Sequence, residues 1–153
     1  MSEHPGGEHI LEYNQITDEI YIGTNMCCQV DFAKELLDKG ITAVISLEAE
    51  KMDNPSGVDY FLWLPVVDHY APTDKQLRLG LQTLEFFVKE GIKLYAHCKH
   101  GHGRAPTLVI AYFIKQGMGV DEAIEFVKSK RPSMHLNEIQ IESLREYSKG
   151  LTT

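Results

Sequence analysis

The sequence of 153 residues predicts an α/β fold in which helices flank a central, mostly parallel and twisted sheet. Short, continuous runs of β-branched and aromatic residues alternate along the chain with segments whose apolar residues recur at helical spacing. Glycine, proline and polar capping residues separate these segments at short intervals. Strands that alternate with helices form parallel sheets covered on both faces, and such sheets bind ligands at the carboxyl ends of their strands.

Four apolar segments are the expected strands, and they comprise residues 19–23, 41–47, 60–64 and 94–96. The second is rich in β-branched residues and leads into a polar connection, residues 48–57, which contains the turn sequence Asn54-Pro55-Ser56-Gly57. The fourth leads directly into His97 and Cys98, so we expect these two residues at the carboxyl edge of the sheet.

Capping residues and apolar periodicity predict the first two helices. Asp31 can cap the first, and Gly40 is placed as its C′ residue. Thr73 and Gln76 have the spacing of a capping box and open the second helix, which Gly91 ends. The apolar face of this second helix is formed by Leu77, Leu81, Leu84 and Val88.

The third expected helix, residues 106–115, is apolar nearly all round, so it should be the buried central helix. Pro106 suits its first turn because the missing N–H is not needed there. Two further helices are expected to begin at Asp121 and at Asn137.

The composition indicates one compact domain over residues 1–153, with about the first 15 residues as an N-terminal extension. No apolar run reaches the ~18 residues of a membrane span, and the N-terminus lacks the apolar part of a signal peptide. We therefore expect a cytoplasmic location, and we expect a monomer. The net charge of −7 opposes nucleic acid as a partner.

The cysteines do not suggest a disulfide framework, because there are only three of them. The adjacent residues Cys27 and Cys28 are expected to remain reduced, since vicinal cysteines bridge only with strain. We expect them to be two half-buried residues that enter the first helix.

The segment between the fourth strand and the central helix gives the strongest indication of function. Cys98 is followed by five residues, two of them glycine, and then by Arg104. Glycines let the backbone fold tightly around a ligand, and a helix N-terminus presents N–H donors to an anion. The loop is therefore expected to bind a doubly charged tetrahedral anion and to favour the thiolate form of Cys98, a combination suited to phosphoryl transfer. The candidate phosphate-binding residues are Lys99, His100, Gly101, His102, Gly103 and Arg104.

At these residues the sequence resembles the cysteine-dependent protein phosphatases, specifically the small dual-specificity type, whose motif is His-Cys-(five residues)-Arg. The resemblance covers most of the chain. It implies a two-step reaction without metal or cofactor, in which Cys98 attacks phosphorus, Arg104 holds the equatorial oxygens and an aspartic acid protonates the leaving oxygen. Phosphotyrosine proteins are the implied substrates, together with phosphoserine and phosphothreonine proteins. The other segments that carry the resemblance are residues 20–23 and 40–47, the loop around Asp68, residues 131–133, Asn137 and Gln140.

One residue departs from the family pattern. Ala105 stands where most members have a Ser or Thr, whose hydroxyl stabilises the departing thiolate in the second step. The alanine at this position is expected to slow hydrolysis of the phosphoenzyme. The hydroxyl of Thr107, one turn into the helix, is a candidate replacement for the missing one. His97 and Gln140 are expected to support the loop by hydrogen bonds or packing.

Asp68 is the candidate general acid because it lies in the loop that follows the third strand, thirty residues before Cys98. Asp74 competes for this role, but it lies in the first turn behind the Thr73 cap, where the helix dipole accounts for a carboxylate. Asp53 and Asp59 belong to the preceding connection and to the start of a strand.

Two alternatives remain open. The basic side chains of the loop favour a phosphatase of phosphoinositides or other phospholipids, and a Gly-Arg-Ala-Pro run is also found in glucan phosphatases. A phosphate-binding protein without catalytic activity is less favoured, because Cys98, Arg104 and Asp68 are all intact. No set of residues has the spacing of metal ligands, so no metal is expected.

Overall fold

The computed structural model describes residues 10–151, and its centre is a five-stranded sheet with the order β1-β2-β5-β3-β4. β1 is antiparallel to β2, and every other neighbouring pair is parallel, as the sequence predicts. β1 comes from residues that we had assigned to an N-terminal extension. The strands are β1 (Tyr13–Gln15), β2 (Ile20–Gly23), β3 (Ile41–Glu48), β4 (Tyr60–Val66) and β5 (Lys93–His97).

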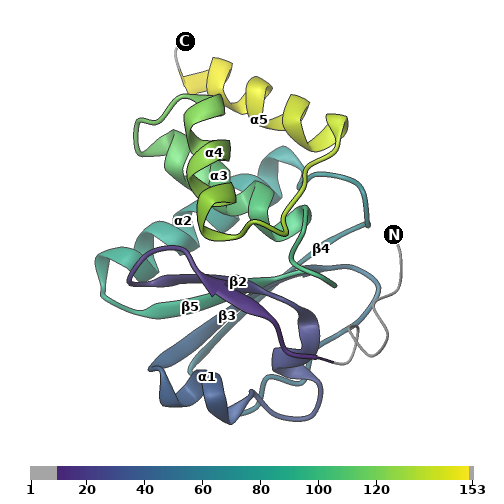
Figure 1. The fold of residues 1–153 in the computed structure, drawn as a ribbon, viewed down its shortest axis with the longest axis vertical. Helices are drawn as coiled ribbons and strands as arrows, with labels where there is room; N and C mark the ends of the chain where they lie inside the picture. Colours follow the sequence, from purple (N-terminus) through teal and green to yellow (C-terminus); the bar gives the residue numbers. More distant parts are fainter. Residues whose placement is uncertain (1–9, 152–153) are drawn as a thin grey trace.

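Helices cover both faces of the sheet unequally (Figure 1). The four long helices lie on one face, whereas the short helix α1 and the 3₁₀ turn η2 lie on the other. No helix within residues 10–151 has both the length and the apolar character needed to cross a membrane. The helical segments are η2 (Asn25–Cys28), α1 (Lys34–Asp38), α2 (Asp74–Lys89), α3 (Arg104–Lys115), α4 (Val120–Lys130) and α5 (Glu138–Leu151).

Two apolar clusters form the core, one on each face of the sheet. Along β5, Leu94 and Ala96 belong to the larger cluster beneath the long helices, while Tyr95 belongs to the smaller one. This alternation is the period of two that a strand imposes on its side chains. α3 is buried from Arg104 to Ile114, which confirms it as the central helix.

Three of the predicted helix boundaries are confirmed by local hydrogen bonds or backbone angles. Thr73 Oγ1 accepts a hydrogen bond from Gln76 N at 3.1 Å, and Gln76 Oε1 accepts one from Thr73 N at 3.0 Å. Asn137 and Gln140 make the same reciprocal pair before α5. Gly40 has a φ of 87° directly after the C-cap of α1, a conformation that favours glycine.

Two other helix starts are corrected. The prediction that Asp31 caps the first helix is wrong, because α1 begins at Lys34 with Ala33 as its N-cap and without a side-chain cap. Tertiary contacts explain the late start, since Ala33 N donates to Cys27 O at 2.8 Å and the buried Phe32 donates its N–H to Ser56 O at 2.9 Å. α4 begins at Val120, one residue before Asp121.

The expectation for Cys27 and Cys28 is also wrong. The two residues are joined by a vicinal disulfide, and neither side chain is exposed. They lie in η2 rather than at the start of α1, and η2 turns both of them into the smaller apolar cluster. Among the described residues, Cys98 is the free cysteine.

Candidate active site

Cys98 lies where the sequence predicts, directly after the carboxyl end of β5. β5 is flanked by the parallel strands β2 and β3, so the segments that follow all three strands meet at one edge of the sheet. The cysteine is 3% exposed, and the loop that follows it ends at Arg104, the first residue of α3. The loop therefore joins a buried strand to a buried helix, and both of its ends are fixed.

The backbone of this phosphate loop, residues 98–104, is turned so that its carbonyl groups point outwards. Each carbonyl from Cys98 to Gly103 contacts a donor group outside the loop. Because the C=O and N–H of a trans peptide unit point in opposite directions, the N–H groups that follow these carbonyls point into the cup. The donors are His97 Nδ1 for Cys98 (3.2 Å), Asn25 N for Lys99 (3.2 Å), Arg131 Nη2 and Nε for His100 and Gly101 (2.8 Å each), His135 N for His102 (2.9 Å) and Thr107 Oγ1 for Gly103 (2.7 Å).

Two glycines are required by this geometry. Gly101 has a φ of 71°, and a Cβ there would lie 2.6 Å from the carbonyl oxygen of Gly23. A Cβ at Gly103 would lie 2.7 Å from Gln140 Oε1. The backbone of β2 can therefore approach Gly101 only because a side chain is absent there, whereas a side chain at Gly103 would displace the end of the Gln140 side chain.

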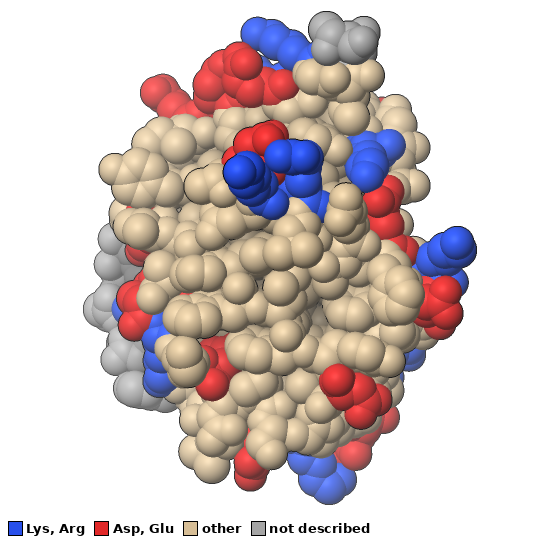
Figure 2. Space-filling model, turned by 180° about the vertical axis from the view of Figure 1, so that it is seen from behind, with Lys and Arg blue, Asp and Glu red and all other residues tan. Residues whose placement is uncertain are grey.

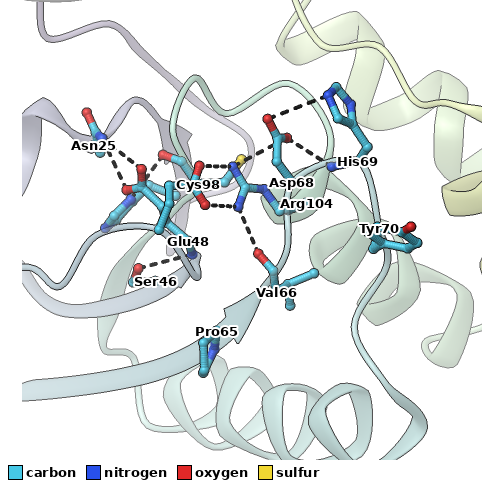
Figure 3. A network of polar contacts seen from close by, with 12 residues as sticks. Asn25, Ser46, Glu48, Pro65, Val66, Asp68, His69, Tyr70, Cys98 and Arg104 are labelled. Carbon is cyan, nitrogen blue, oxygen red and sulfur yellow. Dashed lines mark hydrogen bonds and ion pairs between the residues drawn. The ribbon is translucent and has the colours of Figure 1, made fainter.

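Arg104 is 2% exposed, and its guanidinium connects the phosphate loop to two other segments (Figure 3). Nη1 donates to Val66 O at 2.8 Å, and Nη1 and Nη2 make a bidentate pair with the Glu50 carboxylate at 2.8 and 2.9 Å. The hydrogen bonds from Arg104 lower the pKa of Glu50, although partial burial opposes this shift. Burial lowers the pKa of Arg104, but the bonds to Glu50 and the charge of Cys98 outweigh this, and the net shift is upwards.

Asp68, the candidate general acid, lies beside Arg104. Its Oδ1 is 3.5 Å from Arg104 Nη2, and its side chain is 55% exposed. The acid loop, residues 67–71, is held from α5, because the Asn137 side chain donates to His69 O at 2.8 Å and Gln140 Nε2 donates to Tyr70 O at 3.2 Å. His69 has a φ of 74°, which is uncommon for a residue with a side chain. Asp74 instead pairs with Arg78 on the exposed first turns of α2.

Arg131 holds the phosphate loop from behind, at the end of α4. Its guanidinium is fully buried, and it reaches Asn14 Oδ1 at 2.8 Å as well as the carbonyls of His100 and Gly101. Burial lowers the pKa of Arg131, and the charges of Glu12, Tyr95 and Cys98 partly offset this. An arginine nevertheless remains charged, so a cation lies directly behind the cup.

His97 is buried and pairs with an acidic residue of the β3–β4 connection. His97 Nε2 is 2.6 Å from Asp53 Oδ2. Glu48, at the end of β3, has a ligand atom within 4.8 Å of this pair and accepts two hydrogen bonds from Asn25 Nδ2 at 3.1 and 3.2 Å. Burial raises the pKa of Glu48, and the hydrogen bonds from Asn25 only partly oppose that shift.

The remaining predicted residues lie around the rim or support it. Lys99 is exposed, and His100 stacks on His102, with ring centroids 5.5 Å apart. His135, to which the sequence assigns no role, lies beside His102, with the ring centroids 4.9 Å apart and the rings tilted by 45°. The Thr107 hydroxyl donates its proton to Gly103 O, so it is engaged in the loop and does not stand in for the hydroxyl missing at Ala105.

Four residues of the site received no role from the sequence: Asn25, Glu50, Asp53 and Arg131. Glu50 and Asp53 follow β3, whose carboxyl end lies next to that of β5, so the strand pattern offered a signal for them. Asn25 and Arg131 contact the loop from η2 and from the end of α4, distant in sequence, and no local pattern predicts those contacts.

Comparison with known proteins identifies the family. A family model described as "Dual specificity phosphatase, catalytic domain" matches residues 20–150. The chain belongs to this family. The match confirms the dual-specificity phosphatase resemblance that the sequence indicates over most of the chain.

Two curated relatives and two solved structures illustrate the membership. Tyrosine-protein phosphatase vhp-1 of Caenorhabditis elegans is 30% identical over 138 residues, which cover 89% of this chain but only 21% of that protein. Phosphatidylglycerophosphatase and protein-tyrosine phosphatase 1 of Mus musculus is 31% identical over 129 residues, covering 76% of this chain and 66% of the relative. The crystal structure of PTPMT1 matches with a TM-score of 0.77 at 30% identity and covers 92% of this chain and 96% of that one. Human DUSP28 matches with a TM-score of 0.81 over 91% and 97% of the two chains, and at 20% identity it supports the fold alone.

Proposed function

We propose that this chain hydrolyses phosphate monoesters through a phosphocysteine formed on Cys98. The observation that carries the proposal is the outward turn of every carbonyl from Cys98 to Gly103, which directs a ring of N–H groups at one point beside the cysteine. Arg104 and Asp68 flank that point, 3.5 Å apart at their nearest atoms. Membership of the dual-specificity phosphatase family supports the same reading.

In the first step, the Cys98 thiolate attacks phosphorus, and an S–P bond forms as the ester P–O bond breaks. The loop N–H groups and Arg104 stabilise the negative charge that is spread over the three equatorial oxygens in the loose transition state. The Asp68 carboxyl gives its proton to the leaving oxygen, which departs as an alcohol or a phenol. Asp68 is left as a carboxylate beside the mouth of the cup.

In the second step, water attacks the phosphocysteine, and the S–P bond breaks. The Asp68 carboxylate takes a proton from this water, so that inorganic phosphate and the Cys98 thiolate are regenerated and Asp68 is again protonated. Ala105 offers no hydroxyl to the departing thiolate, and Thr107 is engaged with Gly103. We therefore expect this second step to be slow.

We propose phosphotyrosine proteins as the main substrates, together with phosphoserine and phosphothreonine proteins. The name of the relative vhp-1, a tyrosine-protein phosphatase, supports this class. The Asp68 side chain is 55% exposed beside Arg104, which suits a phosphate carried on a bulky protein chain. We extend the proposal to a single catalytic domain over residues 1–153 that acts as a cytoplasmic monomer. The free thiol of Cys98 supports reducing surroundings, whereas the Cys27–Cys28 disulfide does not.

A phospholipid phosphatase is the second candidate. The mouse relative is named as a phosphatidylglycerophosphatase as well as a tyrosine phosphatase, and PTPMT1 has been solved in complex with PI(5)P. The rim of this chain supports the idea, because Lys99, His100, His102 and His135 surround the phosphate loop with basic groups. A panel of phosphotyrosine and phosphothreonine peptides, phosphoinositides and phosphatidylglycerophosphate would rank the two candidates by kcat/KM.

The test of the reaction itself uses p-nitrophenyl phosphate in the presence of EDTA. We expect turnover without added metal, and we expect Cys98→Ser to abolish turnover while vanadate still binds, because a neutral hydroxyl is a much weaker nucleophile than a thiolate. Turnover of the serine variant at the rate of the unaltered chain would place the nucleophile elsewhere. Complete loss of activity on chelation would contradict the metal-free mechanism.

A further inference from the structure

A buried ion pair lies behind the phosphate loop, and the reaction as described above does not use it. His97 is the last residue of β5, and Asp53 belongs to the connection between β3 and β4. His97 Nε2 and Asp53 Oδ2 are 2.6 Å apart, and neither side chain is exposed to solvent. Burying a carboxylate is costly unless it is paired, so this contact requires an explanation.

The contacts of the two ring nitrogens fix the number of protons in the pair. His97 Nδ1 is 3.2 Å from the carbonyl oxygen of Cys98, and a carbonyl can only accept, so Nδ1 carries a proton. A second proton must lie between Nε2 and Oδ2, because at 2.6 Å two bare acceptors would repel each other. With both protons on His97 and with Asp53 ionised, the charge of each buried group is balanced by the other.

A proton explains the short contact better than a metal ion would. Glu48, Asp53 and His97 bring their ligand atoms within 4.8 Å of one another. Two ligand atoms bound to one tetrahedral zinc ion lie about 3.3 Å apart, given Zn–N and Zn–O distances of about 2.0 Å. The observed 2.6 Å is a hydrogen-bond distance instead.

The surroundings leave His97 as the group that stabilises Asp53. Asp53 Oδ1 is buried and has no hydrogen-bond partner within residues 10–151. Glu48 approaches the pair from β3, but its carboxylate is occupied by Asn25. The other titratable or charged groups near His97 and Cys98 are Tyr95 on β5, Arg104 on α3 and Arg131 at the end of α4, and the disulfide-bonded Cys27 and Cys28 on η2 lie beside His97.

We propose that Asp53 is a positioning residue for the phosphatase reaction, and that it acts by keeping His97 protonated on both ring nitrogens. The resulting imidazolium holds the Cys98 carbonyl outwards, where the geometry of the cup needs it, and places positive charge next to the thiolate. This inference rests on the proposed function, since it concerns the same cysteine. It assigns to the β3–β4 connection a part in activating the nucleophile.

The first test measures the protonation of His97 directly by ¹⁵N NMR of the unaltered chain. The expected result at pH 7.5 is a His97 ring with two protonated nitrogens, assigned by its absence from the His97→Gln variant. The same ring in Asp53→Asn should carry one proton, because the amide can hydrogen-bond a neutral imidazole but cannot balance an imidazolium. A singly protonated His97 in the unaltered chain would overturn the proposal.

The second test measures how fast iodoacetate alkylates Cys98 at pH 6, since only the thiolate reacts. Asp53→Asn, which keeps the shape of the side chain, should slow alkylation by about three- to tenfold, because a smaller fraction of Cys98 is then present as the thiolate. His97→Gln should slow it similarly, and the double variant should be no slower than either. Asp59→Asn, an exposed residue of the same connection, is the matched control and should alkylate at the rate of the unaltered chain.

A rate for Asp53→Asn within about twofold of the unaltered chain would overturn the proposal, as would additive slowing in the double variant. Neither measurement needs turnover. The proposed role of Asp53 can therefore be disproved even if the chain hydrolyses phosphate esters. Conversely, both tests can support that role even if the chain has no phosphatase activity.

Discussion

The two loops that meet at the candidate active site are held in different ways. The phosphate loop is fixed by contacts with β2, η2, the end of α4 and α3. Most of the side chains that support this loop are buried. The acid loop is attached through two carbonyl groups, those of His69 and Tyr70, to side chains at the start of α5, and Asp68 itself is 55% exposed. Closely packed segments resist local opening more than exposed ones do.

This difference indicates how the two loops divide the chemistry. Oriented N–H donors contribute most when they need no reorganisation during the reaction, so a rigid cup is an advantage. A general acid must instead be delivered to leaving groups of different size, and an exposed loop can adjust to them. We therefore expect the cup to capture phosphate without rearrangement, while the more exposed acid loop adjusts to the leaving group.

Among the substitutions that test this comparison of the two loops, we expect the largest loss of activity from a change in the acid loop. Asp68→Asn should lower kcat by about 10²–10⁴-fold, and substrates with good leaving groups should be affected least, because they need the proton least. The alkaline side of the pH profile should flatten, since activity no longer depends on a protonated carboxyl. Steady-state kinetics with a phosphotyrosine peptide and with p-nitrophenyl phosphate would measure both effects.

Asp74→Asn is the matched control for this prediction. It should cost only a few tenths of a kcal/mol of stability, because Asp74 interacts with the α2 dipole and with Arg78 at an exposed surface. If Asp74→Asn cripples turnover while Asp68→Asn does not, the assignment of the acid is wrong.

A smaller effect is expected from a change in Arg131, which supports the phosphate loop, and it is measured as a loss of stability. Arg131→Lys should reduce the free energy of unfolding by about 2–3 kcal/mol, because a single ammonium cannot replace the guanidinium bonds to His100, Gly101 and Asn14. Denaturation with urea would measure the loss. Arg145→Lys, on the exposed side of α5, is the control. A loss for Arg131→Lys within about 0.5 kcal/mol would show that the cup does not depend on this side chain.

The smallest effect concerns Glu50, which contacts Arg104 from a partly exposed position. Arg104 lowers the pKa of Glu50, so the folded state favours the ionised form and this pair stabilises the protein at neutral pH. Because the Glu50 side chain is 40% exposed, Glu50→Gln should cost no more than about 1 kcal/mol at pH 7. The difference should shrink as the pH falls below the ordinary value of 4.5 and vanish below the lowered pKa. A difference that grows in acid would contradict this assignment.

The sequence predicts the parts of this molecule whose structure depends on nearby residues. The alternation of apolar runs predicts β2, β3, β4 and β5, and the Thr73 capping box predicts the start of α2. The prediction for Asp31 fails because tertiary hydrogen bonds to Cys27 and Ser56 delay α1. A local capping preference is weaker than such contacts.

In the candidate site, too, the features that depend on nearby residues could be predicted, and those that depend on tertiary contacts could not. Cys98, Arg104 and the glycines lie in one short segment, so their arrangement could be predicted from spacing alone. The contacts that Arg131, Asn25 and Asp53 make with this segment join residues that are distant along the chain. They depend on strand order and on where helices end, which a single sequence does not specify.

The central claim is that Cys98 carries the phosphoryl group between two chemical steps. The most direct measurement mixes the chain with a phosphotyrosine peptide, quenches the reaction in acid within one turnover and locates the added phosphoryl group by mass spectrometry. We expect the phosphoryl group on the peptide that contains Cys98, accumulating to a large fraction of the enzyme because Ala105 slows its hydrolysis. A quenched reaction that has released the dephosphorylated peptide but shows phosphate on another residue, or on none, would contradict the account.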